Sequence, residues 1–209
     1  YASNSPGGIV NVVTAAPKTD KYSASASLEA GNYGLFTGQG MVNAPIVSNK
    51  LAARLSLQTQ KRDNYLTGAN LQGENTKSVR LKTLYQPVED FSATITGSWS
   101  KMGNAGFFAN NVKAFDYQDG HYQDGTKVTN PWTAYTGMGP GANYDFSGDR
   151  ITKGITADIK LDTGIGSLSV VPSYSVSNSD NETTGTTTVS GETIIYKTYI
   201  AMESEQKGF

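Results

Sequence analysis

Apolar and polar residues alternate with a period of two along much of this chain, a spacing that predicts β-strands with one apolar and one polar face. In 22–31, Tyr22 and every second residue to Ala30 share the apolar face, whereas Ser23 and every second residue to Glu29 share the other. The pattern returns in 51–60, 78–85, 91–100, 155–162, 168–177 and 194–201. We therefore expect an all-β chain.

Two of the predicted strands are less regular than the others. In 194–201 the alternation is weaker, and the apolar set is Ile194, Tyr196, Thr198 and Ile200. An eighth candidate, 33–46, is interrupted by glycine. About eight strands are therefore expected.

Charged residues avoid the apolar faces of the seven regular segments. These faces offer 32 positions and carry no charge, although charged residues make up 17% of the chain. Because a charge on the lipid side of a membrane strand costs about 2–4 kcal/mol, the deficit is expected if these faces contact lipid. The alternative is a soluble sandwich or barrel, in which the same faces would pack inward.

Aromatic residues and link lengths favour a membrane barrel. Four aromatic residues stand at strand ends on the apolar faces, where interfacial girdles lie: Tyr22, Tyr85, Phe91 and Trp99. Short links (47–50, 87–90 and 163–167) alternate with long links (61–77, 101–150 and 179–192). All short turns would then lie on one rim, as in outer-membrane barrels. We therefore expect an antiparallel transmembrane β-barrel.

Composition removes several classes of function. The net charge of -1 gives no support for a nucleic-acid partner. The absence of cysteine excludes disulfides and thiolate metal sites. A single histidine and the absence of a Gly-x-Ser-x-Gly elbow give no basis for a histidine-based metal site or a catalytic triad. We expect no enzymatic activity, no metal and no cofactor.

The stretch NSPGGIVNVVT (4–14), followed by Ala16-Pro17-Lys18, resembles the end of the plug domain in TonB-dependent outer-membrane receptors. The residues that carry this plug motif include Asn4, Gly7, Gly8 and Asn11. Four later segments are similar to barrel segments of the same family: GNYG (31–34), VNAPIV (42–47), LAARLSLQTQKRDNY (51–65) and ESEQKGF (203–209). The resemblance thus follows the chain in order from end to end.

This resemblance implies a domain organisation and a function. Residues 1–18 would be the C-terminal end of a plug domain, and 19–209 would be the first strands, about eight, of a barrel that closes with about 22. The implied location is the bacterial outer membrane, in contact with its lipid. The implied activity is import of a scarce small-molecule ligand, such as a siderophore, a vitamin or an oligosaccharide. The energy would come from the TonB complex, which acts through a part of the receptor upstream of this chain.

The long link 101–150 is the expected ligand-binding loop, because aromatic side chains on an external loop can stack on rings or sugar faces. The candidates are Phe107, Phe108, Tyr117, His121, Tyr122, Trp132 and Tyr135. The alternative is that these aromatics form a small core within the loop. The charges of the loop nearly cancel, which favours a neutral ligand.

Six charged residues of the predicted polar faces are expected to face the barrel lumen: Glu29, Arg54, Arg80, Lys82, Asp158 and Lys160. By the resemblance they would contact the plug or line the ligand path, and structural salt bridges are the other interpretation. Two other functions fit the pattern. One is a passive outer-membrane porin, which lacks a plug, and the other is a soluble glycan-binding β domain, which needs no detergent.

Overall fold

The computed structural model describes residues 13–63, 70–71, 73–103, 115–116, 121–122, 143–189 and 192–208. Every regular element in these ranges is a β-strand. The long strands are β1 (Ser23–Gly31), β2 (Leu35–Val47), β3 (Leu51–Arg62), β5 (Glu74–Val88), β6 (Phe91–Gly103), β9 (Asn143–Thr163), β11 (Ser173–Val189) and β12 (Glu192–Gly208). The short strands are β4 (Asn70–Leu71), β7 (Phe115–Asp116), β8 (His121–Tyr122) and β10 (Gly166–Val170).

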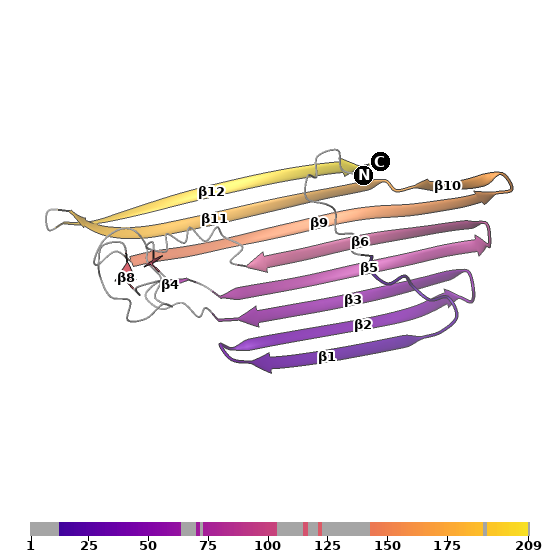
Figure 1. The fold of residues 1–209 in the computed structure, drawn as a ribbon, viewed down its shortest axis with the longest axis horizontal. Coiled ribbons are helices and arrows are strands. Elements are labelled where there is room, and N and C mark those ends of the chain that lie inside the picture. Colours follow the sequence, from indigo (N-terminus) through magenta and orange to yellow (C-terminus); the bar gives the residue numbers. More distant parts are fainter. Residues whose placement is uncertain are drawn as a thin grey trace.

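The eight long strands form one antiparallel sheet in the order β1-β2-β3-β5-β6-β9-β11-β12, in which each strand pairs with the next long strand of the chain (Figure 1). The expected all-β, antiparallel fold is therefore confirmed. The sheet is open, with β1 and β12 at its two edges, so its closure into a barrel stays a prediction. No helix in the described ranges is long and apolar enough to cross a membrane.

The short strands attach to this sheet or pair separately. β4 lies parallel to β9, β7 pairs with β8, and β10 pairs with β9 in the same register as β11. The break between β10 and β11 falls at Val171 and Pro172, because proline has no N–H to donate to the sheet. The Pro172 carbonyl still accepts a hydrogen bond from the Ala157 N–H at 3.0 Å, which preserves the alignment. The segment 168–177 therefore behaves as one interrupted strand, as the alternation predicts.

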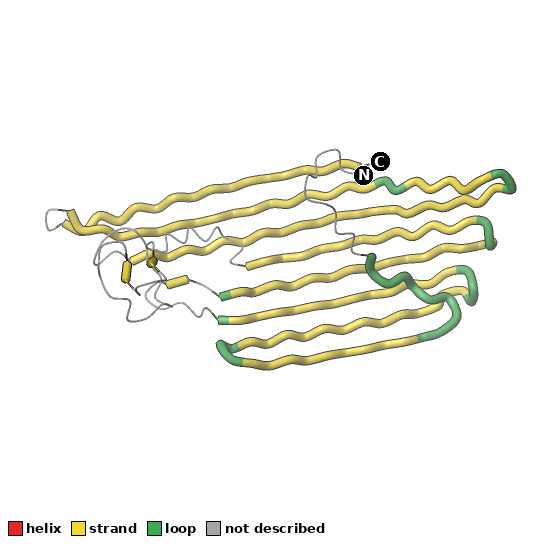
Figure 2. The backbone as a smooth tube through the Cα atoms, viewed as in Figure 1, coloured by secondary structure: helices red, strands yellow, loops and turns green. Residues whose placement is uncertain are grey.

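Short turns gather at one end of the sheet. The links β2–β3, β5–β6 and β9–β10 turn at Ser48–Lys50, Glu89–Asp90 and Gly164–Ile165, and all three lie at the right-hand end of the sheet in Figure 2. We call this the turn end and the opposite end the loop end. The predicted short links are therefore correct.

One predicted long link is wrong. Residues 179–189 are not part of a loop, because Ser173–Val189 pairs with Glu192–Gly208 over the full length of both strands. The sequence of β11 beyond Ser179 is rich in threonine and has no apolar face, so the alternation gives no signal there. Threonine is β-branched, however, and fits a strand as well as an apolar residue does.

The phase predicted for the last strand is also wrong. The pairing Ser179↔Met202 and Asn181↔Ile200 places Ile194, Tyr196, Thr198 and Ile200 on the polar side of the sheet. The opposite side of β12 carries Lys197, Tyr199, Glu203, Glu205 and Lys207. The misleading signal is the Ile194-Ile195 pair, which supplies an apolar residue to each face.

The first hairpin depends on Gly34, and this gives a testable prediction. Tyr33 and Gly34 have φ angles of 60° and 62°, as the two central residues of a tight hairpin require. A Cβ on Gly34 would also collide with the Asp63 carboxylate. We expect Gly34→Ala to destabilise the folded protein by about 1–2 kcal/mol, measured by urea unfolding. The control is Gly40→Ala in β2, where no atom lies within 4 Å of the added methyl group. Equal effects of the two variants would contradict this account.

Candidate functional site

The two faces of the sheet differ in the chemistry of their side chains. We call the face with Leu55 and Ile95 the outer face, and the face with Arg54 and Lys82 the inner face. One line of Cα partners across the outer face consists of Ala24, Val42, Leu55, Leu81, Gly97, Ile155 and Tyr174. No layer covers this face in the described structure, and exposure reaches 78% for Leu28, 53% for Val42 and 50% for Ile95. Apart from Pro17, the only apolar side chain buried among the described residues is Ala52.

The inner face is organised in rungs, by which we mean lines of Cα partners across seven strands. The uncharged rung is Ser27, Gln39, Gln58, Ser78, Ser100, Thr152 and Ser177. The middle rung, one step toward the turn end, is Ser25, Met41, Ser56, Arg80, Ser98, Gly154 and Ser175. The cationic rung follows, with Ser23, Asn43, Arg54, Lys82, Thr96, Thr156 and Ser173. Positive charge therefore increases from the loop end toward the turn end.

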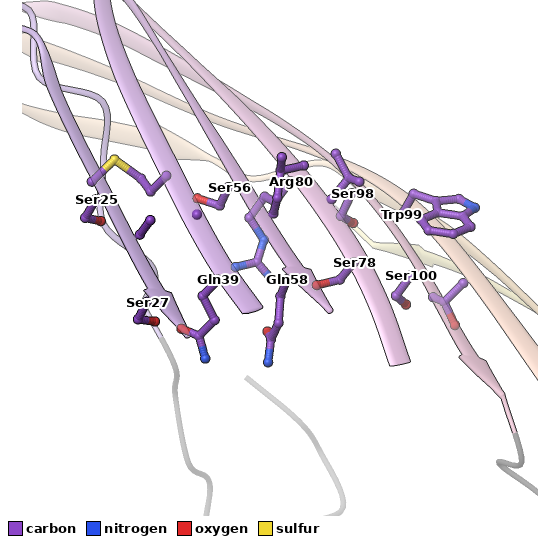
Figure 3. A pocket seen from close by; sticks show the side chains of 16 residues that line it. Ser25, Ser27, Gln39, Ser56, Gln58, Ser78, Arg80, Ser98, Trp99 and Ser100 are labelled. Atoms are coloured by element: carbon purple, nitrogen blue, oxygen red, sulfur yellow. The ribbon is translucent and has the colours of Figure 1, made fainter. Parts of the chain in front are cut away.

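A shallow groove lies along the uncharged and middle rungs (Figure 3). Its volume is about 390 Å³, and side chains from β1, β2, β3, β5, β6 and β9 line it. Hydroxyl and amide groups dominate its polar lining, and Arg80 is the only charged residue in it. Trp99 also borders the groove, but its ring points away from the labelled serine and glutamine side chains in Figure 3. Such a lining can hydrogen-bond a polar solute.

The segment 13–22, which we call the strap, crosses the inner face near the turn end before it enters β1 (Figure 1). Asn43 holds it from β2 with three hydrogen bonds: its Nδ2 donates to the carbonyls of Lys18 (2.9 Å) and Lys21 (2.8 Å), and its Oδ1 accepts from the Lys18 N–H (2.8 Å). Asn43 is fully buried. A buried amide with both ends satisfied in this way acts as a rigid anchor.

Two further contacts attach the strap to the sheet. The Lys82 ammonium donates to the Thr14 carbonyl at 2.8 Å, and the Asn49 N–H donates to the Thr19 carbonyl at 3.1 Å. Pro17 is buried between these points. These contacts reach backbone carbonyls of the strap, and one strap side chain adds to them, since the Tyr22 hydroxyl donates to the Pro45 carbonyl of β2 at 3.1 Å.

All six charged residues predicted for the lumen lie on the inner face by register: Glu29, Arg54, Arg80, Lys82, Asp158 and Lys160. Lys160 and Asp158 form an ion pair of 3.3 Å between neighbours on one strand. Arg54 lies directly opposite Lys82, and Arg80 lies two residues further along β5. The structure thus brings three cations together and keeps Glu29 near the loop end of the sheet.

Other predicted site residues lie outside what the structure describes. The plug-motif residues Asn4, Gly7, Gly8 and Asn11 precede the described ranges, and the loop aromatics Phe107, Phe108, Tyr117, Trp132 and Tyr135 fall between them. The backbones of His121 and Tyr122 form β8, which pairs with β7. The role of all these loop residues in ligand binding stays a prediction.

Asn43 is the functional residue that the sequence does not reveal. Its neighbours in 42–47 resemble a barrel segment, but a single asparagine on a polar face has no periodic signal that separates it from exposed polar residues. Its partners Lys18 and Lys21 lie more than 20 positions earlier in the chain. Only the fold brings them together.

The described residues contain no group of three or more His, Cys, Asp or Glu side chains that could hold a metal ion. A scan against protein-family models, a search of curated proteins and a search of solved structures each found no match. The described part of the chain thus combines four features: an exposed apolar face, a polar groove, a cationic rung and an anchored strap.

Proposed function

We propose that this chain belongs to a TonB-dependent receptor of the bacterial outer membrane, which imports a small solute through a β-barrel whose interior holds an upstream plug domain. The observation that carries the proposal is the chemistry of the two faces of one sheet. From β1 to β6 the outer face toward the turn end is apolar and uncovered, whereas on β12 it carries charged side chains; the inner face is polar and carries the strap.

The outer face supports contact with lipid. Leaving apolar surface in water costs about 25 cal/mol per Å². Large side chains on this face remain strongly exposed, among them Leu28, Val42, Leu81 and Ile155. A hydrocarbon environment removes that cost without a second protein layer. Neighbouring long strands pair along most of their shared length, with irregularities at Pro45–Val47 and Tyr85–Val88, and such backbone pairing is the main requirement of a membrane-spanning sheet.

The strap supports an occupied interior. It reaches the inner face from the N-terminal side of β1 and is bound to β2 and β5. Thr14, near the start of the strap, therefore lies on the polar side of the sheet. An upstream domain placed there would meet hydroxyl, amide and cationic groups, which can hydrogen-bond it and also leave a hydrated path for a solute.

Fractionation of cells that express the full chain tests the membrane location. We expect the protein in the outer-membrane fraction, retained after a carbonate wash and released only by detergent. The reason is that the outer face of β1 to β6 exposes many large apolar side chains. Recovery in the soluble fraction without detergent would contradict the proposal and favour a soluble glycan-binding domain.

Conductance in a planar lipid bilayer separates a plugged receptor from a porin. We expect the full-length protein to insert without an open-pore current, because the upstream domain would occupy the interior. A steady ohmic current through the intact protein would instead identify a passive porin, since porins leave an aqueous channel.

A further inference from the structure

Three cations are neighbours on the inner face, and none of them has a carboxylate of the described residues within ion-pair distance, as is also true of Arg150 on the same face. Lys101, Lys160, Lys197 and Lys207 each pair with a carboxylate within 2.6–3.3 Å. Arg54, Arg80 and Lys82 form no ion pair within the described structure. Like charges directly opposite each other on neighbouring strands destabilise a sheet, and Arg54 and Lys82 occupy such positions. The charge of Asp158 acts on Lys82, but this carboxylate is paired with Lys160, so the two arginines have no carboxylate of their own in the described part of the chain.

The three side chains do not have equal capacity to bind an anion. Lys82 already donates to the Thr14 carbonyl of the strap. Arg54 and Arg80 have no such partner in the described structure. Each guanidinium is a planar fork that can bind a carboxylate or a phosphate through two parallel hydrogen bonds. Arg54 and Arg80 are therefore the donors available to a ligand.

The neighbouring groove indicates what the rest of that ligand is like. Arg80 lines the groove, and the uncharged rung of hydroxyl and amide side chains lies on its loop-end side. A volume of about 390 Å³ falls within the range of small-molecule sites. Once past the line of partners that holds Glu29 and Arg150, a solute moving from the loop end would cross the uncharged rung before it reached Arg80 and Arg54.

We propose that Arg54 and Arg80 bind the carboxylate or phosphate of a hydroxyl-rich solute, while the uncharged rung binds its neutral hydroxyl groups. This inference rests on the proposed transport function, because it names the class of solute that the inner face conducts. It differs from the expectation drawn from the charges of the link 101–150, which favour a neutral ligand. The difference arises because the inner-face charges come from separate strands and become neighbours only in the sheet.

Binding to the full-length protein in detergent micelles tests the site with three probes of similar size: glucuronate, glucose 6-phosphate and glucose. We expect at least one anionic probe to bind tenfold or more tightly than glucose, with an affinity that falls as salt is raised. The anionic probe that binds tells whether the site takes a carboxylate or a phosphate. Equal affinity for all three probes, or no binding of either anion, would overturn the inference.

Variants locate the site. We expect Arg54→Gln and Arg80→Gln each to weaken binding of the anionic probe at least tenfold and to leave glucose binding unchanged. The control is Lys207→Gln, which removes the same charge from the outer face of β12, where Lys207 pairs with Glu205. An equal loss in the control variant would mean that only net charge matters and would refute the site. Both arginine variants are expected to have an unfolding midpoint equal to or above that of the wild type, because each removes repulsion with Lys82.

The binding test can fail or succeed independently of the tests of the transport proposal. Binding in micelles needs neither a membrane location nor energy coupling. If the protein binds the anion but conducts an open-pore current, the anion site is supported and the plugged-receptor function is refuted. If the protein is membrane-bound and closed but binds neither anion, the plugged-receptor function is supported and the anion site is refuted.

Discussion

Ile95→Arg is expected to abolish stable insertion of the protein into a bilayer. Ile95 lies at the middle of the outer face of β6, between Phe91 and Trp99, and half of its surface is exposed. A charge at this depth costs about 2–4 kcal/mol if the outer face contacts lipid. The measurement is denaturant titration of the protein folded in phosphatidylcholine vesicles, with the folded fraction read from gel mobility of unheated samples.

The matched control is the adjacent residue on the other face. Thr94 lies on the inner face, where its Cα partner on β9 is Asp158. We expect Thr94→Arg to fold with near wild-type stability, because the new charge faces a hydrated surface and a carboxylate. Equal tolerance of arginine at both positions would show that the outer face does not contact lipid, and the membrane proposal would have to be withdrawn.

Asn43→Leu is expected to release the strap from the sheet. The substitution removes three hydrogen bonds and leaves the Lys18 N–H and two carbonyls without their partners. Each buried group left unsatisfied costs about 1–3 kcal/mol. We therefore expect the Lys18 amide, which is protected in the wild type, to exchange with solvent at least a hundredfold faster, as measured by hydrogen exchange and mass spectrometry.

Two further variants sharpen this test. Asn43→Asp keeps an acceptor for the Lys18 N–H but loses both donors, so we expect an intermediate rate of exchange. Gln39→Leu changes an exposed inner-face residue on the same strand that does not contact the strap, and it should leave exchange at Lys18 unchanged. Unaltered protection in Asn43→Leu would show that Lys82 and the buried Pro17 hold the strap without the asparagine.

The alternation of apolar and polar residues predicts most strands of this sheet, because each regular strand has one apolar face and one polar face. Leu55, Leu81 and Ile95 lie on one face, as expected, and Arg54, Arg80 and Thr94 lie on the other. The glycine-interrupted segment 33–46 still forms a strand, since Gly38 and Gly40 take outer-face positions between Phe36 and Val42. Periodicity carries this information because side chains alternate across a strand.

Periodicity fails where a strand no longer separates two environments. The part of β11 beyond Ser179, at the loop end, is polar on both faces. The sequence pattern there therefore does not distinguish a paired strand from a loop. The candidate site shows a different limit. Arg54 and Lys82 are each predictable as inner-face residues, but their contact depends on the register between β3 and β5, which the spacing of residues within one strand does not determine.

The hairpin of β11 and β12 extends beyond the apolar part of the sheet at the loop end (Figure 1). The apolar outer face of β11 ends at Val176, and the next outer-face positions are Asn178 and Asp180. Beyond that point cross-strand contacts stiffen the ribbon, with Tyr199 bonded to Asp180 at 3.0 Å and Lys197 to Glu182 at 2.7 Å. At about 3.3 Å per residue, the dozen residues to Val189 span about 40 Å. If the protein lies in the outer membrane as proposed, with its loop end outward, an antibody or a virus particle would touch this ribbon well before it reached the lipid headgroups.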